Sequence, residues 1–451
     1  MSRYHARWVV PIHTAPIENG TVVVEGRKIA WVGPRREAPK GDRDVDLGDA
    51  VLLPGLVNAH THLELTAMRG FLEGLDFVQW IRTLTAARAA VLDEAQMLDS
   101  ARLGIAEGLQ AGITTYADTC SSGVAIQAMR DLGVRGIMYQ EVFGPAPEQR
   151  DAAMAGLAAA IDRLRPLESD LVRLGVSPHA PYTVSDDLMI DASAYAVRHR
   201  MPVAIHLAES REEIAFLREG EGPFAQALRA RGIDVVRRSH SPVHWLVEMG
   251  VMMAHPLLIH CVQVDADDIS FIGEWSCPVA HCPASNAKLG HGIAPIREML
   301  GKDVVVGLGS DSVASNNAMD LLAEARQAVL TQNAAMGRPD ALGARQVLRL
   351  ATMGGAQALG LAGQIGSLEA GKDADLAAFP LDGIRAMPVF DPESALVFAL
   401  PGTAARLVTV AGRERVRDGH LVEGTLDGAV TDRVRASARA LAAWREEAQG
   451  R

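Results

Sequence analysis

The sequence predicts an α/β fold: a TIM-type (β/α)8 barrel joined to a small β-sandwich domain that both ends of the chain build. Eight short β-rich apolar runs alternate with Ala-rich helical stretches in the middle of the chain, which favours parallel strands with crossover helices. Strand-like runs with glycine turns lie at both ends. The predicted boundaries are 1–53 and 366–430 for the small domain, 54–365 for the barrel and 431–451 for a C-terminal helix.

The small domain begins with the pattern of a hairpin. Residues 21–33, TVVVEGRKIAWVG, are two β-rich runs joined by a polar turn at 25–28. At the other end, ADLAAFPL (374–381) and ARLVTVAGRERVRDGHLV (405–422) are again strand-like. The last segment, TDRVRASARALAAWREEAQG, has the spacing of an amphipathic surface helix, and we expect it at the contact of a homodimer.

The barrel prediction depends on eight strand-like runs, a number that suits a TIM-type barrel in roughly 300 residues. In chain order they are LLPGLVNAHTH, GITTYADT, VRGIMYQEV, LVRLGVSPHA, PVAIHLAES, LLIHCVQ, CPVAHCP and DVVVGLGSD. Polar residues at the carboxyl ends of such strands form the active site in this fold. A lone histidine there is more often a core residue, but a whole set falls at predicted strand ends: His60, His62, His179, His206, His260, His281 and Asp311.

His60 and His62 stand one residue apart at the end of the first run. Residues i and i+2 of a strand point to the same side, so both imidazoles should face the barrel mouth. Burying two imidazoles at one point is costly unless a metal ion binds them. Later strands end in His206, His260 and Asp311, which supply further nitrogen and oxygen atoms. We therefore expect a divalent metal ion, Zn²⁺ in preference to Fe²⁺ or Mn²⁺.

Composition excludes several classes of function. The chain of 451 residues carries a formal charge of −11, which argues against nucleic acid or an anionic membrane surface as a partner. Its four cysteines contain no CxxC pair and are expected to be reduced, buried thiols of a cytoplasmic protein. The N-terminus lacks the pattern of a signal peptide, and no apolar run reaches the roughly 18 residues that would span a membrane.

Six motifs resemble those of the amidohydrolase superfamily, most closely its mononuclear aminohydrolase branch. They are PGLVNAHTHLE, SPHAPYTVS, IHLAES, IHCVQVD, VAHCPASNAKLGHGIAPI and VGLGSDSVASNN, and the resemblance covers nearly the whole chain. It implies that Glu209 shuttles protons and that His260 orients the metal-bound water without binding the metal itself. The metal ligands that it implies are His60, His62, His206 and Asp311.

The chemistry of these residue types agrees with that mechanism. A metal ion lowers the pKa of a bound water to about 7, which makes hydroxide at neutral pH. Asp311 can bind the metal and accept a hydrogen bond from the water. Glu209 follows His206 by three residues and can carry a proton from the water to a ring nitrogen. Hydroxide then attacks the amine-bearing carbon, and ammonia leaves.

The same resemblance bounds the number of metal ions. Binuclear relatives use a carboxylated lysine at the end of the fourth strand. This chain has no lysine between Lys40 and Lys288, and its fourth run ends at His179. We therefore predict one metal ion.

The resemblance implies an aminated purine as substrate, first of all an adenine nucleoside: adenosine, methylthioadenosine, S-adenosylhomocysteine or aminodeoxyfutalosine. His179 resembles a position that contacts substrate, and Trp80 is placed to stack on a flat heterocycle. In methylthioadenosine/S-adenosylhomocysteine deaminases, a ribose-binding glutamate and a third-strand arginine stand where this chain has Ala89 and Gln140. Glu64 of HTHLE is the expected replacement for a ribose diol. HTHLE and the long fifth crossover look more like aminodeoxyfutalosine deaminases.

Two alternatives remain open. A guanine or 8-oxoguanine deaminase, a triazine chlorohydrolase or an imidazolone-type hydrolase would use the same metal-activated water, so the ligands do not separate these reactions. A non-enzymatic scaffold would be expected to lose ligands or the proton shuttle, and this chain keeps all of them.

Overall fold

The computed structural model describes residues 1–449, and eight parallel strands form its centre. They are β6 (Leu56–Thr61), β7 (Ile113–Cys120), β8 (Arg135–Val142), β9 (Val172–Pro178), β10 (Ala204–Leu207), β11 (Leu257–His260), β12 (Val279–His281) and β13 (Val306–Leu308). Seven of these strands lie within one of the predicted runs, and β7 extends one residue beyond its run, to Cys120. They pair in chain order as two four-stranded sheets, β6 to β9 and β10 to β13.

Isolated parallel bridges join the two sheets at both seams. Val176 pairs with Val203 at one seam, and Thr61 pairs with Asp311 at the other. At the second seam the Thr61 hydroxyl donates to the carbonyl oxygen of Asp311 at 3.1 Å, and the Asp311 amide donates to the carbonyl oxygen of His60 at 3.0 Å. This seam therefore fixes the backbone of the first and last strand ends, where predicted metal ligands lie.

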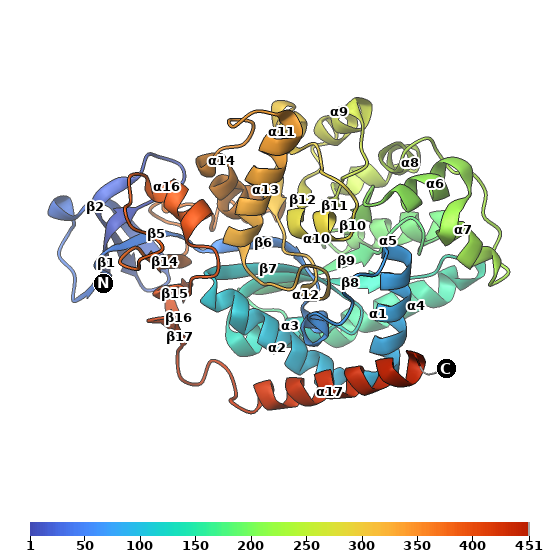
Figure 1. Cartoon of the computed structure of the whole chain (residues 1–451), viewed down its shortest axis with the longest axis horizontal. Helices are drawn as coiled ribbons and strands as arrows, with labels where there is room; N and C mark the ends of the chain where they lie inside the picture. The colour runs from blue at the N-terminus through green and yellow to red at the C-terminus, as the bar shows by residue number, and fades with distance from the viewer. Residues whose placement is uncertain (450–451) are drawn as a thin grey trace.

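Helices connect the strands and cover the sheets (Figure 1). The strands are buried along nearly their whole length, as expected for parallel strands with helices on their outer face. The helices are α1 (Phe77–Val91), α2 (Glu94–Gln110), α3 (Val124–Leu132), α4 (Arg150–Leu164), α5 (Asp186–Arg198), α6 (Arg211–Glu219), α7 (Gly222–Arg229), α8 (Pro242–Glu248), α9 (Ala266–Glu274), α10 (Pro283–Lys288), α11 (Ile296–Gly301), α12 (Val313–Asn316), α13 (Leu321–Met336), α14 (Ala344–Arg349), α15 (Gly355–Ala358) and α16 (Pro392–Ser394).

The two chain ends build one nine-stranded sheet, seen at the left of Figure 1. Its strands are β1 (Ser2–Val9), β2 (Ile17–Glu25), β3 (Lys28–Pro34), β4 (Arg43–Asp46), β5 (Ala50–Pro54), β14 (Leu376–Pro380), β15 (Leu407–Val410), β16 (Arg413–Arg417) and β17 (His420–Leu421). The ends meet where β14 pairs antiparallel with β5. The predicted hairpin is confirmed, because Glu25 pairs with Lys28. The sandwich form and the domain boundaries stay predictions.

A buried ion-pair cluster connects this sheet to the central strands. Arg135 of β8 donates from Nε to Asp375 at 2.9 Å and from a terminal nitrogen to Asp373 at 2.7 Å. All three side chains are at most 2 % exposed. Arg27 and Lys28 also pair with Asp373. The two acids precede β14, so the cluster holds the start of that strand against β8.

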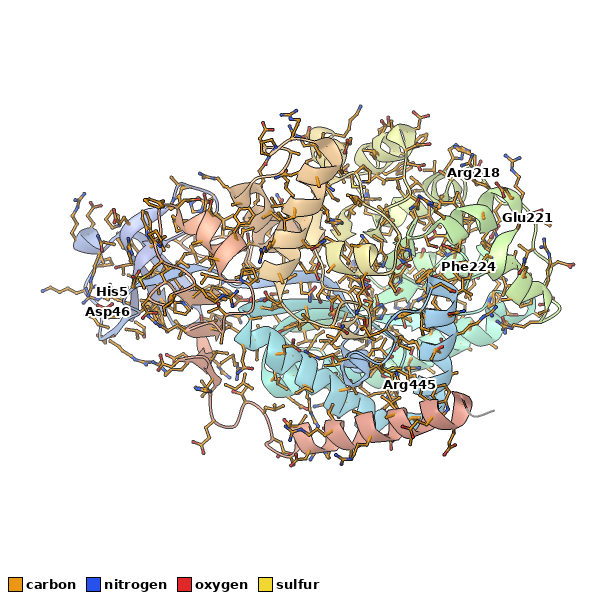
Figure 2. The ribbon with its side chains drawn as sticks, viewed as in Figure 1. His5, Asp46, Arg218, Glu221, Phe224 and Arg445 are labelled. Carbon is orange, nitrogen blue, oxygen red and sulfur yellow. The ribbon has the colours of Figure 1, made fainter. Side chains whose placement is uncertain are left out.

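The predicted C-terminal helix is α17 (Val430–Gln449), drawn in red in Figure 1. It packs along α2 and reaches the segment before α1: Arg433 pairs with Asp99, and the Trp444 ring lies 6.5 Å from that of Phe71. Arg445 lies over the same Phe71 ring and is labelled in Figure 2. Within residues 1–449, no helix combines the length and apolar character needed to cross a membrane. The four cysteines are buried and free, as predicted.

Candidate metal centre and active site

Three imidazoles and a carboxylate converge at the carboxyl ends of the central strands. His60 and His62 come from the end of β6, His206 from β10 and Asp311 from the loop after β13. His62 Nε2 lies 3.3 Å from His206 Nε2. Asp311 Oδ1 lies 3.4 Å from His60 Nε2 and 3.7 Å from His62 Nε2. Tetrahedral nitrogen ligands at zinc are about 3.3 Å apart, so the spacing of these atoms fits one metal ion.

The hydrogen bonds of His62 and His206 place a proton on Nδ1 of each ring. His62 Nδ1 lies 3.0 Å from the carbonyl oxygen of Thr119, and His206 Nδ1 lies 3.1 Å from that of His179. A carbonyl only accepts, so each Nδ1 is the protonated nitrogen. Burial lowers the pKa of both rings, so each is neutral, and the two Nε2 atoms face each other without a proton to share. A cation is the partner that such a pair requires.

His60 gives independent support for a metal. Its Nε2 is buried and has no hydrogen-bond partner among the described residues. Burial lowers the pKa of His60 to about 4, so the ring is neutral and ready to act as a ligand. The donor set of nitrogen and carboxylate oxygen is the one that catalytic zinc uses.

Asp311 is held in one orientation. Its Oδ2 accepts hydrogen bonds from the hydroxyls of Ser285 and Ser315, which leaves Oδ1 to face the histidines. Asp311 has a φ of 56°, and His260 has a φ of 76°. A non-glycine residue pays a conformational penalty in this left-handed region, and such residues concentrate at functional sites.

Glu209 lies between two imidazoles, beside the cluster of candidate metal ligands (His60, His62, His206 and Asp311), which is called the metal cluster below. Its Oε1 is 3.5 Å from His260 Nε2 and 3.3 Å from His291 Nε2. Burial would raise the pKa of this carboxyl, but His260 and His291 hold it below its ordinary value. Glu209 is therefore a carboxylate that can take up a proton.

The side chain of Glu213 holds the loop that carries Glu209. The buried Glu213 carboxylate accepts hydrogen bonds from the backbone amides of Ala208 at 2.7 Å and Glu209 at 3.0 Å. His260 is fixed in a similar way, since its Nδ1 lies 3.0 Å from Asn286 Oδ1. Hydrogen bonds thus hold both the Glu209 backbone and the His260 ring in place.

A cavity of about 460 Å³ opens over these residues, a size typical of small-molecule sites. One wall is the face of α1 that carries Phe77, Trp80, Ile81, Leu84, Thr85 and Arg88. Trp80 thus lines the cavity, and its stacking on a heterocycle stays a prediction. Phe224 of α7, labelled in Figure 2, stacks on the cavity residue Tyr182 at 4.0 Å.

His179 also lines the cavity, with its ring 4.7 Å from that of His206. Its Nδ1 lies 2.8 Å from the Thr183 hydroxyl, which itself donates to the carbonyl of Ala180. Nδ1 is then the donor, and Nε2 is an acceptor that faces Glu141 at 4.0 Å. Burial lowers the pKa of His179 to about 3, which keeps the ring neutral.

Glu64 lines the cavity but binds protein groups. It pairs with Arg88 at 2.8 Å and accepts hydrogen bonds from Cys120 at 3.0 Å and from the Ser122 hydroxyl. Arg88, which the sequence analysis did not single out, also donates to the Ser121 hydroxyl. The ribose contact of Glu64 stays a prediction.

The structure brings all the predicted site residues to one cavity or its floor. Sequence reasoning missed four supporting residues: Arg88, Glu213, Asn286 and His291. Two of them lie inside the quoted motif VAHCPASNAKLGHGIAPI, so a signal was present for these. Glu213 and Arg88 lie on helical stretches, where a charged residue usually faces solvent.

Comparison with known proteins then places the chain. A family model described as "Amidohydrolase family" matches residues 51–415. The chain belongs to the amidohydrolase family. The prediction of a metal-dependent hydrolase of the deaminase type is confirmed at this level.

Relatives of this amidohydrolase cover nearly its full length. It is 35% identical over 429 residues to a 5-methylthioadenosine/S-adenosylhomocysteine deaminase of Syntrophobacter fumaroxidans, covering 94% of this chain and 93% of the relative. A zinc-bound adenosine deaminase of Xanthomonas campestris superposes with a TM-score of 0.87 at 29% identity, covering 98% of both chains. An atrazine chlorohydrolase of Arthrobacter aurescens, complexed with zinc, gives 0.83 at 26% identity over 98% of this chain and 100% of the other.

An aminofutalosine deaminase of Helicobacter pylori, in complex with methylthio-coformycin, gives a TM-score of 0.79 at 21% identity. The match covers 92% of this amidohydrolase and the whole of the other chain. At this identity the likeness shows the fold alone.

Proposed function

We propose that this amidohydrolase is a hydrolytic deaminase of an adenine nucleoside that uses one divalent metal ion, zinc. The observation that carries the proposal is the position of Glu209. It is a buried carboxylate beside the metal cluster, it lines the cavity, and two imidazoles hold its pKa low. The named activities of the relatives in Syntrophobacter fumaroxidans and Xanthomonas campestris support the same substrate class.

The chain's own residues perform the proton transfers. When bound, a divalent metal at the His60, His62, His206 and Asp311 cluster supplies an acidified water, since it lowers the pKa of water to about 7. Glu209 takes a proton at Oε1 and delivers it to a ring nitrogen of the purine, which makes the amine-bearing carbon electrophilic.

His260 supports these transfers by position. With Nδ1 directed at Asn286 Oδ1 and Nε2 directed at Glu209, both of its nitrogens face acceptors. This position puts His260 beside the Glu209 carboxylate and beside the oxygen that develops negative charge during the reaction. The apolar face of α1, with Trp80, excludes water and stacks on the base.

Three structural statements belong to this proposal. We infer that the eight parallel strands close into a TIM-type barrel, because bridges occur at both seams. We keep the predicted domain boundaries and the β-sandwich. We also propose a homodimer, whose contact includes α17.

The structural likeness to an atrazine chlorohydrolase favours a second candidate, hydrolytic displacement of chloride from a triazine. The same metal cluster and carboxylate would serve this reaction. The leaving group separates the two, because one reaction releases ammonia and the other releases chloride.

A coupled ammonia assay on the zinc-loaded protein tests the proposal. The panel is adenosine, methylthioadenosine, S-adenosylhomocysteine, aminodeoxyfutalosine, guanine and 8-oxoguanine, with chloride release from atrazine measured beside it. We expect ammonia from at least one adenine nucleoside and a loss of that signal in the Glu209→Gln variant. Ammonia from guanine alone, or chloride release without ammonia, would overturn the proposal.

A further inference from the structure

Glu141 is a buried acid of the cavity that the deamination chemistry does not use. It lies near the end of β8, where its backbone pairs with Ser177 of β9. Its side chain is only 7 % exposed and lines the cavity. No residue between 1 and 449 donates a hydrogen bond to its carboxyl group, and His179 Nε2 lies 4.0 Å from its Oε1.

A buried polar group without a partner calls for an explanation, because its desolvation is not offset. Burial and the neighbouring Glu64 carboxylate raise the pKa of Glu141 to about 8, against the opposite effect of Arg88. This is the state of a carboxyl that lacks donors. Hydrogen-bond donors on a ligand would favour the charged form and lower the pKa.

The neighbouring Glu64 has little acceptor capacity left. Its two oxygens already face Arg88, Cys120 and the hydroxyls of Ser121 and Ser122. A carboxylate offers about four acceptor positions, so these donors account for most of them. No described residue donates to the carboxyl group of Glu141, and its side chain lines the cavity.

The gap between Glu141 and His179 is bounded by acceptors. His179 Nε2 carries a lone pair, since Nδ1 is the donor to Thr183. A second metal ion does not fit there. Such an ion would need Glu141, His179 and His206 as ligands. His206 directs Nε2 toward His62 and Nδ1 toward the carbonyl of His179, which leaves no free nitrogen. The gap therefore takes an uncharged hydrogen-bond donor.

The donors of an adenine nucleoside are its 6-amino group and its sugar hydroxyls, whereas the ring nitrogens N1, N3 and N7 only accept. The amino group is the one that leaves at the metal. We propose that Glu141 binds the sugar hydroxyls of the substrate, as a bidentate acceptor for a vicinal diol. This assignment depends on the proposed function. It makes Glu141 a specificity-determining residue, with Arg88 and Ser121 on the same wall.

Four substrates that differ only in the sugar test this assignment: adenosine, 2′-deoxyadenosine, 3′-deoxyadenosine and 2′,3′-dideoxyadenosine. We measure kcat/KM for each with the zinc-loaded wild type, Glu141→Gln and Glu64→Gln. We expect the wild type to prefer adenosine to the dideoxy analogue by roughly 10- to 100-fold, the range of hydrogen bonds to a charged group. Glu141→Gln should reduce this ratio about tenfold or more. Glu64→Gln should leave the ratio unchanged, in contrast to the ribose contact that the sequence predicts for Glu64.

Glu148→Gln is the matched control, because Glu148 is exposed and follows the same strand. It should show the wild-type ratio. Equal losses for all four substrates in Glu141→Gln would overturn the assignment, as would a ratio that depends on Glu64 alone. If Glu141→Gln does not fold, a wild type that deaminates all four substrates equally still overturns it. No ammonia from any nucleoside overturns the proposed function instead, a result distinct from deamination without sugar preference.

Discussion

His291 Nε2 lies 3.3 Å from Glu209 Oε1, and among residues 1–449 that carboxylate is the charged group it pairs with. The His291 ring also packs edge-on against Phe77, the first residue of α1, with 4.4 Å between ring centroids. A single imidazole thus contacts both Glu209, the proposed proton shuttle, and the helix that walls the cavity. His291 is a positioning residue in this arrangement, since it acts through Glu209.

Replacing His291 should affect proton transfer more than binding. We expect His291→Ala to lower kcat about tenfold, a part of the 10²–10⁴-fold that general acid–base catalysis contributes. Loss of the ring should raise the pKa of Glu209, so the acidic limb of the kcat/KM profile should move to higher pH. His291→Asn keeps a donor and should restore part of the rate.

The exposed His420 gives the control, and His420→Ala should match the wild type at every pH. An unchanged acidic limb in His291→Ala would show that His291 does not act on Glu209.

Glu209→Gln removes the proton acceptor while keeping shape and burial. We expect kcat to fall by about 10²–10⁴-fold, with the bound metal retained, because an amide oxygen cannot carry the proton. Steady-state ammonia release and metal analysis of the same sample measure both quantities. Glu219→Gln, an exposed change at the end of α6, serves as the control. A Glu209→Gln variant with more than a tenth of the wild-type kcat would contradict the assigned role.

Arg135→Met should destabilise the fold by about 3–5 kcal/mol, because it leaves Asp373 and Asp375 buried without their shared cation. The free energy of unfolding from urea titration measures this loss. The double variant Arg135→Met/Asp375→Asn should recover part of it, since one uncompensated charge is removed. A loss below 1 kcal/mol in the single variant would mean that the cluster does not hold the terminal sheet to β8.

The stability of the folded protein should depend on pH through the ionisation of Asp373. Burial opposes ionisation, but Arg27, Lys28 and Arg135 hold the pKa of Asp373 at about 2. A depressed pKa stabilises the folded state above the ordinary value near 4, and this contribution is lost as the pH falls toward 2.

Melting temperatures between pH 2 and pH 6 check the expectation for Asp373. The wild type should lose stability across the acidic range more steeply than Asp373→Asn does. Asp151→Asn, at a side chain that is 97 % exposed, should follow the wild-type curve. Parallel curves for the wild type and Asp373→Asn would contradict the assigned pKa.

Strand positions and the residues of the candidate metal site were predictable because each has a local signal. Apolar β-rich runs bounded by polar residues predict parallel strands, and all eight appear in order. His60 and His62 converge on one point, as expected for residues i and i+2 of a strand.

The supporting residues were harder to predict, because their roles depend on distant partners. Arg88 is one charged residue on a helix until the fold places it 2.8 Å from Glu64. Glu213 becomes a buried acceptor only because the Glu209 loop turns back over it. Glu141 marks a strand end in the sequence, but its lack of donors is visible only in three dimensions. Substrate specificity depends on such contacts, which explains why the sequence left the heterocycle open.

The metal content of one preparation, measured with its ammonia release before and after chelation, tests the central claim most directly. We predict about one zinc ion per chain, loss of activity on chelation, recovery on adding zinc, and loss of the bound metal in His62→Ala and His206→Ala. Full activity in metal-free protein, or an unchanged metal content in both variants, would contradict the account.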